Sequence, residues 1–95
     1  MTVKDLAAHR ADIDEIDNRI VALLAKRFAI ASQVADLKRH HGIAVRLDDR
    51  IKEVLDRAAA LAHENGAEPE AIRTIYKSII ETTCLFEEAK IKLTA

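Results

Sequence analysis

The chain contains 95 residues, of which 15 are basic and 16 acidic, so its formal net charge is −1. A general nucleic-acid-binding protein usually carries a clear basic excess, which this composition excludes. One cysteine excludes an internal disulfide, and no apolar run approaches the ~20 residues of a membrane span. We therefore expect a single, mostly helical domain over residues 1–95, located in the cytoplasm.

Breaks in the sequence divide it into three predicted helices. No glycine or proline precedes Gly42, and Asn65-Gly66 followed by Pro69 marks a second break. Strand patterns are absent, so these breaks predict an all-α fold with helices over residues 5–40, 48–65 and 69–92. The expected capping residues are Thr2 with Asp5, Asp48 or Asp49, Gly66, and Pro69 between its two glutamates.

The first predicted helix is too long for the domain that contains it. About 36 residues at ~1.5 Å each give roughly 54 Å, whereas a compact chain of this length is roughly 30 to 35 Å across. Two such rods packed together would bury their apolar stripes, so we expect an intertwined helical homodimer. The stripe has nearly heptad spacing and consists of Leu6, Ile13, Ile16, Ile20, Leu23, Leu24, Ile30, Ala31, Val34 and Leu37.

Three cations lie on the apolar face of this helix. Arg27 interrupts the column of Ile13, Ile20 and Val34, and Lys38 follows Arg27 by three turns, about 16 Å along the axis. Two long side chains that lean together across this gap can hold a small dianion. Arg10 is about 25 Å from Arg27, so only an antiparallel partner helix would bring it to the same pocket. The alternative is that these stems cover apolar surface while their heads stay in water.

The second and third predicted helices add further polar candidates. Arg50 adjoins the apolar stripe of its helix, and the free N–H groups of that helix's first turn suit an anion. Glu87 follows Ile80 and Thr83 on the inner face of the third helix. Burial favours the neutral form of a carboxyl group, so Glu87 is a candidate proton donor, with a salt bridge to a nearby arginine as the alternative. The basic residues expected on the solvated face are Arg46, Lys52 and Arg57.

The remaining reactive side chains give weaker signals. His40-His41 falls at a helix end, where histidine complements the helix dipole more often than it binds a metal. Cys84 is expected to be a small core residue. Neither a phosphate-binding loop nor a nucleophile motif is present, so we expect chemistry without a metal, a cofactor or a covalent intermediate.

Taken together, the polar residues and their spacing resemble the all-helical (AroQ-type) chorismate mutases. The resemblance covers almost the whole chain and rests on "HRADIDEIDNRIVALLAKRFAIASQVADLK", on "DDRIKEVLDRAA" and on "IYKSIIETTCLFEEAK". It implies an intertwined three-helix homodimer with two equivalent active sites, each completed by the N-terminal arginine of the other subunit. The implied reaction is the isomerisation of chorismate, a small dicarboxylate, to prephenate in the shikimate pathway of aromatic amino-acid biosynthesis.

The resemblance also implies a role for each candidate residue. Arg10 of the partner subunit and Arg27 would hold carboxylates, and Lys38 would reach the ether oxygen and a carboxylate. Arg50 and Thr83 would support carboxylate binding. Glu87 stands where the family has glutamine or glutamate as the donor to the ether oxygen, and a glutamate there must be protonated to donate.

One position departs from the pattern of the family. Many chorismate mutases place a glutamate after the arginine that corresponds to Arg50, where it binds the ring hydroxyl, but this chain has Ile51. Isochorismate-pyruvate lyases and 4-amino-4-deoxychorismate mutases resemble this chain in having an apolar residue there. Both activities are therefore alternatives, with isochorismate as the substrate of the lyase. A non-catalytic helical dimerisation module is the alternative from a different class.

Overall fold

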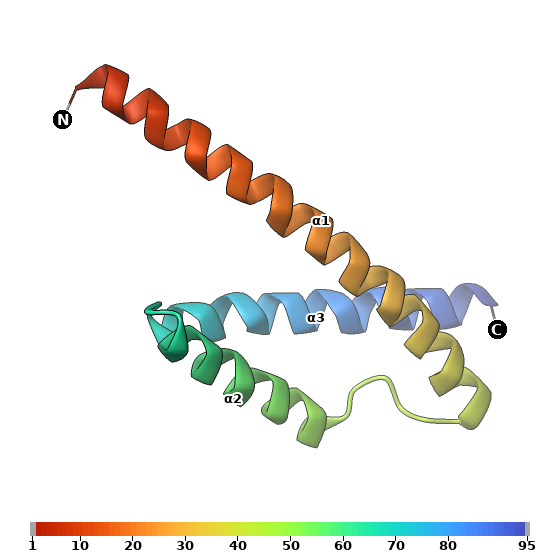
Figure 1. Cartoon of the computed structure of the whole chain (residues 1–95). Coiled ribbons are helices and arrows are strands. Elements are labelled where there is room, and N and C mark those ends of the chain that lie inside the picture. The colour runs from red at the N-terminus through yellow and green to blue at the C-terminus, as the bar shows by residue number, and fades with distance from the viewer. Residues whose placement is uncertain (1, 95) are drawn as a thin grey trace. The chain divides into compact units, whose positions relative to one another are not determined.

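The computed structural model describes residues 2–94, and every regular element within that range is an α-helix (Figure 1). Helix α1 spans Val3–His41, α2 spans Asp48–Glu64 and α3 spans Pro69–Thr94. The predicted all-α fold is confirmed, and each helix boundary lies within two residues of its expected position. The chain forms two compact units, one up to Ile30 and one from Ala31 onward, so α1 belongs to both.

The start of α1 is fixed by the predicted pair of Thr2 and Asp5. The backbone N–H and the hydroxyl of Thr2 donate to Asp5 Oδ2 at 2.9 and 3.0 Å, and the Asp5 N–H donates back to Thr2 Oγ1 at 3.2 Å. These reciprocal bonds satisfy N–H groups that a helix start leaves without an intrahelical partner. The backbone bond from Thr2, followed by the bond from its hydroxyl, lowers the pKa of Asp5. The predicted capping pair is therefore confirmed.

Helices α1 and α2 are each followed, within two residues, by a glycine in the left-handed backbone conformation. Gly42 has φ 63° and Gly66 has φ 71°. After α2, the Ala67 N–H donates to the Ala62 carbonyl at 2.8 Å and the Gly66 N–H donates to the His63 carbonyl at 3.2 Å. These are the two bonds of a Schellman motif, which requires positive φ at the glycine. The prediction of Gly66 as the residue that ends α2 is confirmed.

The start of α2 differs from the expectation. Leu47 is the N-cap residue in an extended conformation and makes no side-chain capping bond. Asp48 and Asp49, expected to cap the helix, instead lie within its first turn. Their charges still favour this end of the helix because its dipole is positive there. Helix α3 begins at Pro69 as predicted, where the missing N–H of proline has no consequence.

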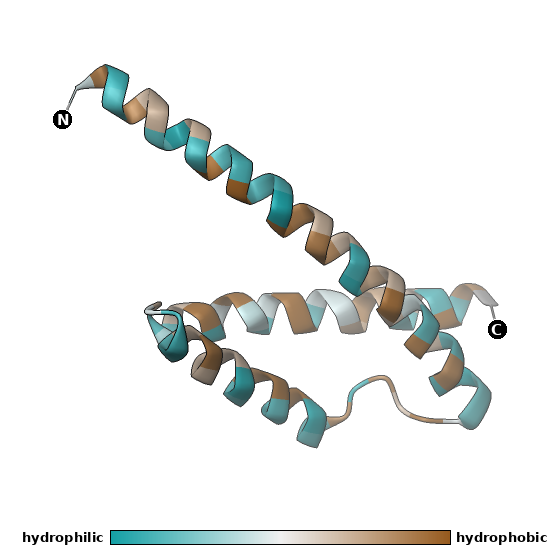
Figure 2. Ribbon diagram, viewed as in Figure 1, coloured by the Kyte–Doolittle hydropathy of each residue, from teal (hydrophilic) through white to brown (hydrophobic). Residues whose placement is uncertain are grey.

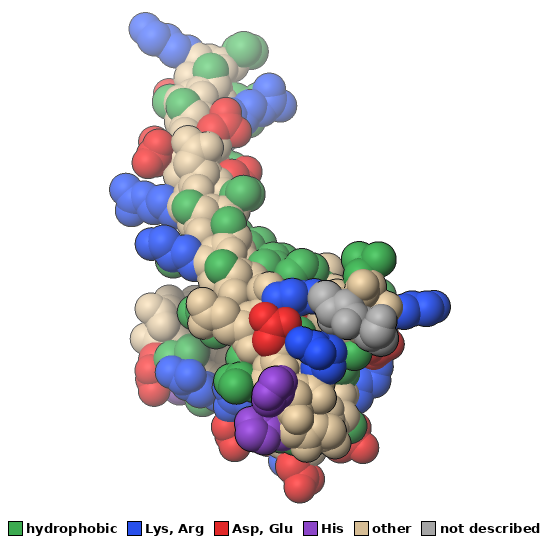
Figure 3. Space-filling model, turned by 90° about the vertical axis from the view of Figure 1, so that its right-hand side faces the viewer, with side chains coloured by type: hydrophobic (Ala, Val, Ile, Leu, Met, Phe, Trp, Pro, Cys, Tyr) green, Lys and Arg blue, Asp and Glu red, His purple; other side chains and the backbone are tan. Residues whose placement is uncertain are grey.

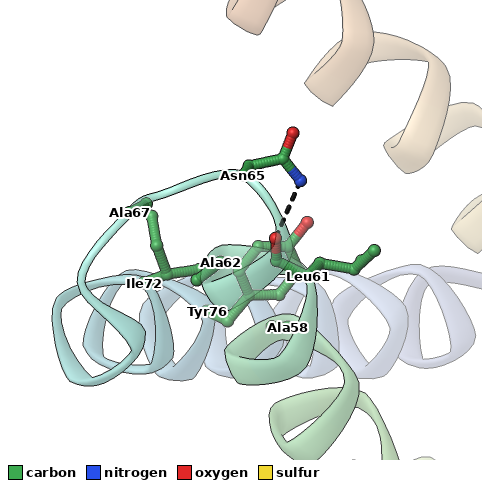
Figure 4. A pocket seen from close by; sticks show the side chains of 7 residues that line it. All are labelled: Ala58, Leu61, Ala62, Asn65, Ala67, Ile72 and Tyr76. Carbon is green, nitrogen blue, oxygen red and sulfur yellow. Dashed lines mark hydrogen bonds between the residues drawn. The ribbon is translucent and has the colours of Figure 1, made fainter.

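The core of the second unit is built from small side chains. Helix α2 packs against α3 (Figure 1), and the buried apolar residues among those described are Ala31, Ala35, Ala58, Ala59, Ala62 and Cys84. A small apolar pocket of 230 Å³ lies where α2 ends and α3 begins (Figure 4). The side chain of Asn65 closes onto the Leu61 carbonyl beside it, with an N–O distance of 2.7 Å.

Helix α1 in the first unit exposes most of its apolar side chains. Apolar and polar residues alternate along it (Figure 2), and hydrophobic side chains lie open between charged ones on its surface (Figure 3). Ile13, Ile16 and Ile20 are each about half exposed. Among the described residues, no helix combines the length and the apolarity needed to cross a bilayer.

Candidate functional site

The candidate site is centred on a buried ion pair between α1 and α3 in the second unit. Lys38 Nζ on α1 lies 3.1 Å from Glu87 Oε1 on α3, and the two side chains are 15% and 6% exposed. Glu87 is the buried charged residue among those described. Charged groups are rarely this buried unless they are paired or serve a function. The expectation that Glu87 faces inward is confirmed, and its ionic partner is a lysine rather than an arginine.

The carboxyl group of Glu87 retains an unused capacity for hydrogen bonding. Its Oε1 is in ionic contact with Lys38, but within residues 2–94 it makes no hydrogen bond. A buried polar atom without a hydrogen bond costs free energy, so such atoms in folded proteins call for an explanation. A polar ligand atom beside Glu87 would supply the missing interaction.

Lys38 is held by a second contact. Its Nζ donates to the Val45 carbonyl at 2.8 Å, in the connector of residues 42–47 between α1 and α2. The backbone positions the start of this connector as well, because the Ile43 N–H donates to the Lys38 carbonyl at 2.8 Å. An ammonium group has three donors, so one directed at Val45 leaves capacity for Glu87 and for a ligand.

The neighbouring residues of α3 set the polarity of the site. Thr83 lies one turn before Glu87, is half-buried, and its hydroxyl donates to the Ile79 carbonyl at 2.7 Å. Cys84 is buried, as expected. Burial, with a smaller effect from the nearby Glu87 and Glu81 carboxylates, raises the pKa of the Cys84 thiol. At neutral pH this group is a thiol rather than a thiolate and is therefore a poor nucleophile.

The first turn of α2 carries the remaining candidates of the second unit. Arg50 is exposed and forms an ion pair with Glu53 on the same helix. Ile51 is half-buried. The guanidinium of Arg50 is therefore accessible to a ligand. Binding a ligand would break its pair with Glu53, but this costs little because exposed pairs within one helix contribute little to stability.

Two predicted cations, Arg10 and Arg27, belong to the first unit. Arg10 is exposed on α1, whereas Arg27 is half-buried. The structure thus brings Lys38 and Glu87 together, with Thr83 one turn away on the same helix. The assembly of all the predicted residues into one pocket stays a prediction.

Arg46, expected only on the solvated face, takes part in a tertiary contact. It is indeed partly exposed, but its guanidinium binds two carboxylates of α3, those of Glu81 and Glu88. The spacing of these glutamates, seven residues apart on one helix, was the available signal. Within the described residues, no cluster of three or more His, Cys, Asp or Glu side chains could hold a metal ion.

Comparison with known proteins gives consistent matches. A family model described as chorismate mutase type II matches residues 9–88. A chorismate mutase of Methanocaldococcus jannaschii is 35% identical over 79 residues, covering 83% of this chain and 80% of that protein. A 4-amino-4-deoxychorismate mutase of Streptomyces pristinaespiralis is 32% identical over 83 residues, covering 87% of this chain and 64% of that protein. A bifunctional chorismate mutase/prephenate dehydratase of Aquifex aeolicus is 32% identical, but the match spans only 26% of its length.

Proposed function

Because the chain belongs to the chorismate mutase type II family, we propose that it is an isomerase that converts chorismate to prephenate. The observation that carries this proposal is the buried pair of Lys38 and Glu87, in which Glu87 Oε1 makes no hydrogen bond within the described residues. A cation and a carboxyl group side by side in a buried site match a substrate with an ether oxygen that gains negative charge.

The proposed mechanism needs only binding and electrostatics. Chorismate has two carboxylates and an enolpyruvyl ether, and the rearrangement breaks the ether C–O bond while a C–C bond forms. Cations that hold both carboxylates keep the enolpyruvyl group of chorismate over its ring in the reactive geometry. In this proposal Lys38 donates to the ether oxygen. Glu87 is ion-paired with Lys38 in the unliganded chain, so it would take up a proton as the substrate binds and then donate to the same atom. Donors fixed in advance stabilise the charge that develops there.

The carboxylates of the substrate would be held by the arginines. Arg27 and Arg50 would bind them from the same chain, Thr83 would line the carboxylate pocket, and Arg10 of the partner subunit would close it. The exposure of Arg10 in the single chain supports this arrangement, because an exposed side chain is available to a second chain.

The proposed homodimer is supported by the apolar surface of α1. Leu23 and Ile30 are 63% and 60% exposed, and Ile13, Ile16 and Ile20 are each about half exposed. Full burial of such a side chain contributes about 1.5 to 3 kcal/mol, so burying the exposed half of each contributes on the order of 1 kcal/mol. Several such side chains on each of two chains provide enough to associate two α1 helices.

A ligand-dependent melting experiment tests the proposal. A dicarboxylate mimic of the transition state, at about 100 times its Kd, should stabilise the protein by about 2.7 kcal/mol. Arg27→Ala should abolish this stabilisation, whereas Lys52→Ala, which removes an exposed cation of α2, should retain it. Unchanged melting of the wild-type protein would favour a non-catalytic dimerisation module.

A second candidate function is the rearrangement of 4-amino-4-deoxychorismate. It is favoured by Ile51 and by the match to two proteins of that name, from Streptomyces pristinaespiralis and Streptomyces venezuelae. A ring hydroxyl has no charged partner at Ile51, so discrimination between ring substituents should be weak there. The test compares kcat/KM for the two substrates and for isochorismate. A preference of more than about tenfold for the amino substrate would replace the primary proposal.

The cytoplasm is the proposed location of this activity. A lone buried thiol such as Cys84 suits a reducing compartment, since it needs no disulfide partner. Fractionation of cells that express the tagged chain checks this assignment.

A further inference from the structure

The connector between α1 and α2 is anchored to α3 by Arg46. Its Nη1 and Nη2 donate to the two carboxylate oxygens of Glu81 at 2.6 and 2.9 Å, and its Nε donates to Glu88 Oε1 at 2.9 Å. Such two-pronged contacts between a guanidinium and a carboxylate fix orientation as well as distance. The bond to Arg46 lowers the pKa of Glu81, so the pair is fully ionised at neutral pH.

The anchored residue is bonded directly to the group that holds Lys38. The Val45 carbonyl and the Arg46 N–H belong to one planar peptide unit. That carbonyl accepts the 2.8 Å hydrogen bond from Lys38 Nζ, and Lys38 Nζ lies 3.1 Å from Glu87 Oε1. A continuous chain of contacts therefore runs from Glu81 and Glu88 through Arg46 and the Val45 carbonyl to the Lys38 ammonium.

We propose that Arg46 is a positioning residue for Lys38: by anchoring the peptide unit of Val45 and Arg46 to α3, it holds the carbonyl that orients the lysine ammonium. The inference rests on the proposed function, in which Lys38 acts on the ether oxygen of the substrate. Arg46 itself does not touch the substrate. It ensures that the ammonium group is already in place before the reaction, which is what electrostatic catalysis requires.

The effect of Arg46 should appear in turnover more than in stability. Its side chain is 42% exposed, and those of Glu81 and Glu88 are 55% and 44% exposed. Ion pairs this exposed contribute little to stability because water and salt screen them. A small displacement of a catalytic group, in contrast, lowers a rate strongly, by up to about 100-fold for 1 Å.

The test compares Arg46→Ala with Arg73→Ala. Arg73 also binds two carboxylates, those of Asp56 on α2 and Glu70 on α3, and both of these residues lie outside the connector. We expect Arg46→Ala to lower kcat about tenfold with KM within about twofold, and Arg73→Ala to leave kcat within about twofold. Arg46→Lys retains the charge but lacks the planar guanidinium that binds both oxygens of Glu81, so its kcat should lie between those of Arg46→Ala and the wild-type protein. A kcat unchanged by Arg46→Ala, or lowered equally by Arg73→Ala, would overturn the inference.

A second variant removes the same anchor from the other side. Glu81→Gln combined with Glu88→Gln should lower kcat as Arg46→Ala does, and adding Arg46→Ala to this pair should lower it no further. This variant also decides the matter if Arg46→Ala does not fold. Additive losses would contradict a shared anchor.

An activity-independent measurement separates this inference from the proposed function. The ammonium protons of Lys38, observed by ¹H–¹⁵N NMR and assigned by their loss in Lys38→Arg, should exchange faster with water in Arg46→Ala and be unaffected in Arg73→Ala. Unchanged exchange in Arg46→Ala overturns the positioning role. Absence of chorismate turnover by the wild-type protein, together with faster exchange in Arg46→Ala, would instead refute the proposed function alone.

Discussion

Replacing Lys38 with methionine tests how strongly the stability of the protein depends on the pair of Lys38 and Glu87. The substitution leaves the Glu87 carboxyl group, whose side chain is 6% exposed, without its neighbouring cation. It also removes the donor to the Val45 carbonyl. Removing one member of a buried ion pair costs about 3 to 5 kcal/mol. Because the Lys38 side chain keeps 15% of its exposure, we expect the lower end, a loss of about 3 kcal/mol in the free energy of unfolding.

The assay is urea unfolding at neutral pH and at equal protein concentration, since dissociation of a dimer would make stability depend on concentration. The matched control is Lys52→Met, which breaks an exposed pair with Asp56 on one helix and should cost less than about 1 kcal/mol. Adding Glu87→Leu to Lys38→Met should recover most of the loss, because an apolar pair replaces an isolated charge. A loss below about 1 kcal/mol for Lys38→Met would refute the reasoning.

Four further predictions follow from individual contacts. Gly66→Ala should lower stability to urea by about 1 to 2 kcal/mol because φ is 71° there and nothing lies within 4 Å of an added Cβ, so only backbone strain acts; no loss would argue against the Schellman geometry. The lowered pKa of Glu81 gives stability that is complete above the ordinary value of 4.5 and is lost as pH falls through the lowered value; Glu81→Gln should weaken the pH dependence of unfolding in that window. Ile20→Glu should convert a dimer into monomers in sedimentation velocity, and a wild-type monomer would refute the proposed association. Donation to the ether oxygen needs a proton-bearing atom at position 87, so Glu87→Gln, whose amide always carries N–H donors, should keep turnover and Glu87→Ala should lose it; an equal loss in both variants would count against this role.

The fold was predictable because the residues that start and end its helices act through their own local backbone conformation. Glycine at positive φ ends a helix by its own conformational freedom. Pro69 starts one for the opposite reason, because its fixed φ suits the first turn, where its missing N–H is not needed. The prediction of an aspartate cap for α2 was wrong because the N-cap is the last residue with extended backbone before the helix, and the sequence alone does not fix which residue that is. The connector 42–47 is held by Lys38 and Arg46, and it places Leu47 rather than Asp48 at the last extended position.

The candidate site was predictable only in part. Helical periodicity places Glu87 on the inner face of α3, and the structure confirms its burial. Periodicity within one helix does not reveal which side chain lies opposite, so only the family resemblance, which assigns Lys38 and Glu87 to the same ether oxygen, indicated that the two residues meet. The anchoring of Arg46 by two glutamates 35 and 42 residues further along the chain depends on tertiary packing in the same way.

The most direct test of the central proposal is identification of the product. The purified protein is incubated with chorismate, and separately with isochorismate, and the products are separated by chromatography against a buffer control that measures the uncatalysed reaction. We predict conversion of chorismate to prephenate, with loss of this activity in Lys38→Ala and its retention in Lys52→Ala. Formation of salicylate and pyruvate from isochorismate while chorismate stays unchanged, or no turnover of either substrate, would contradict the proposal.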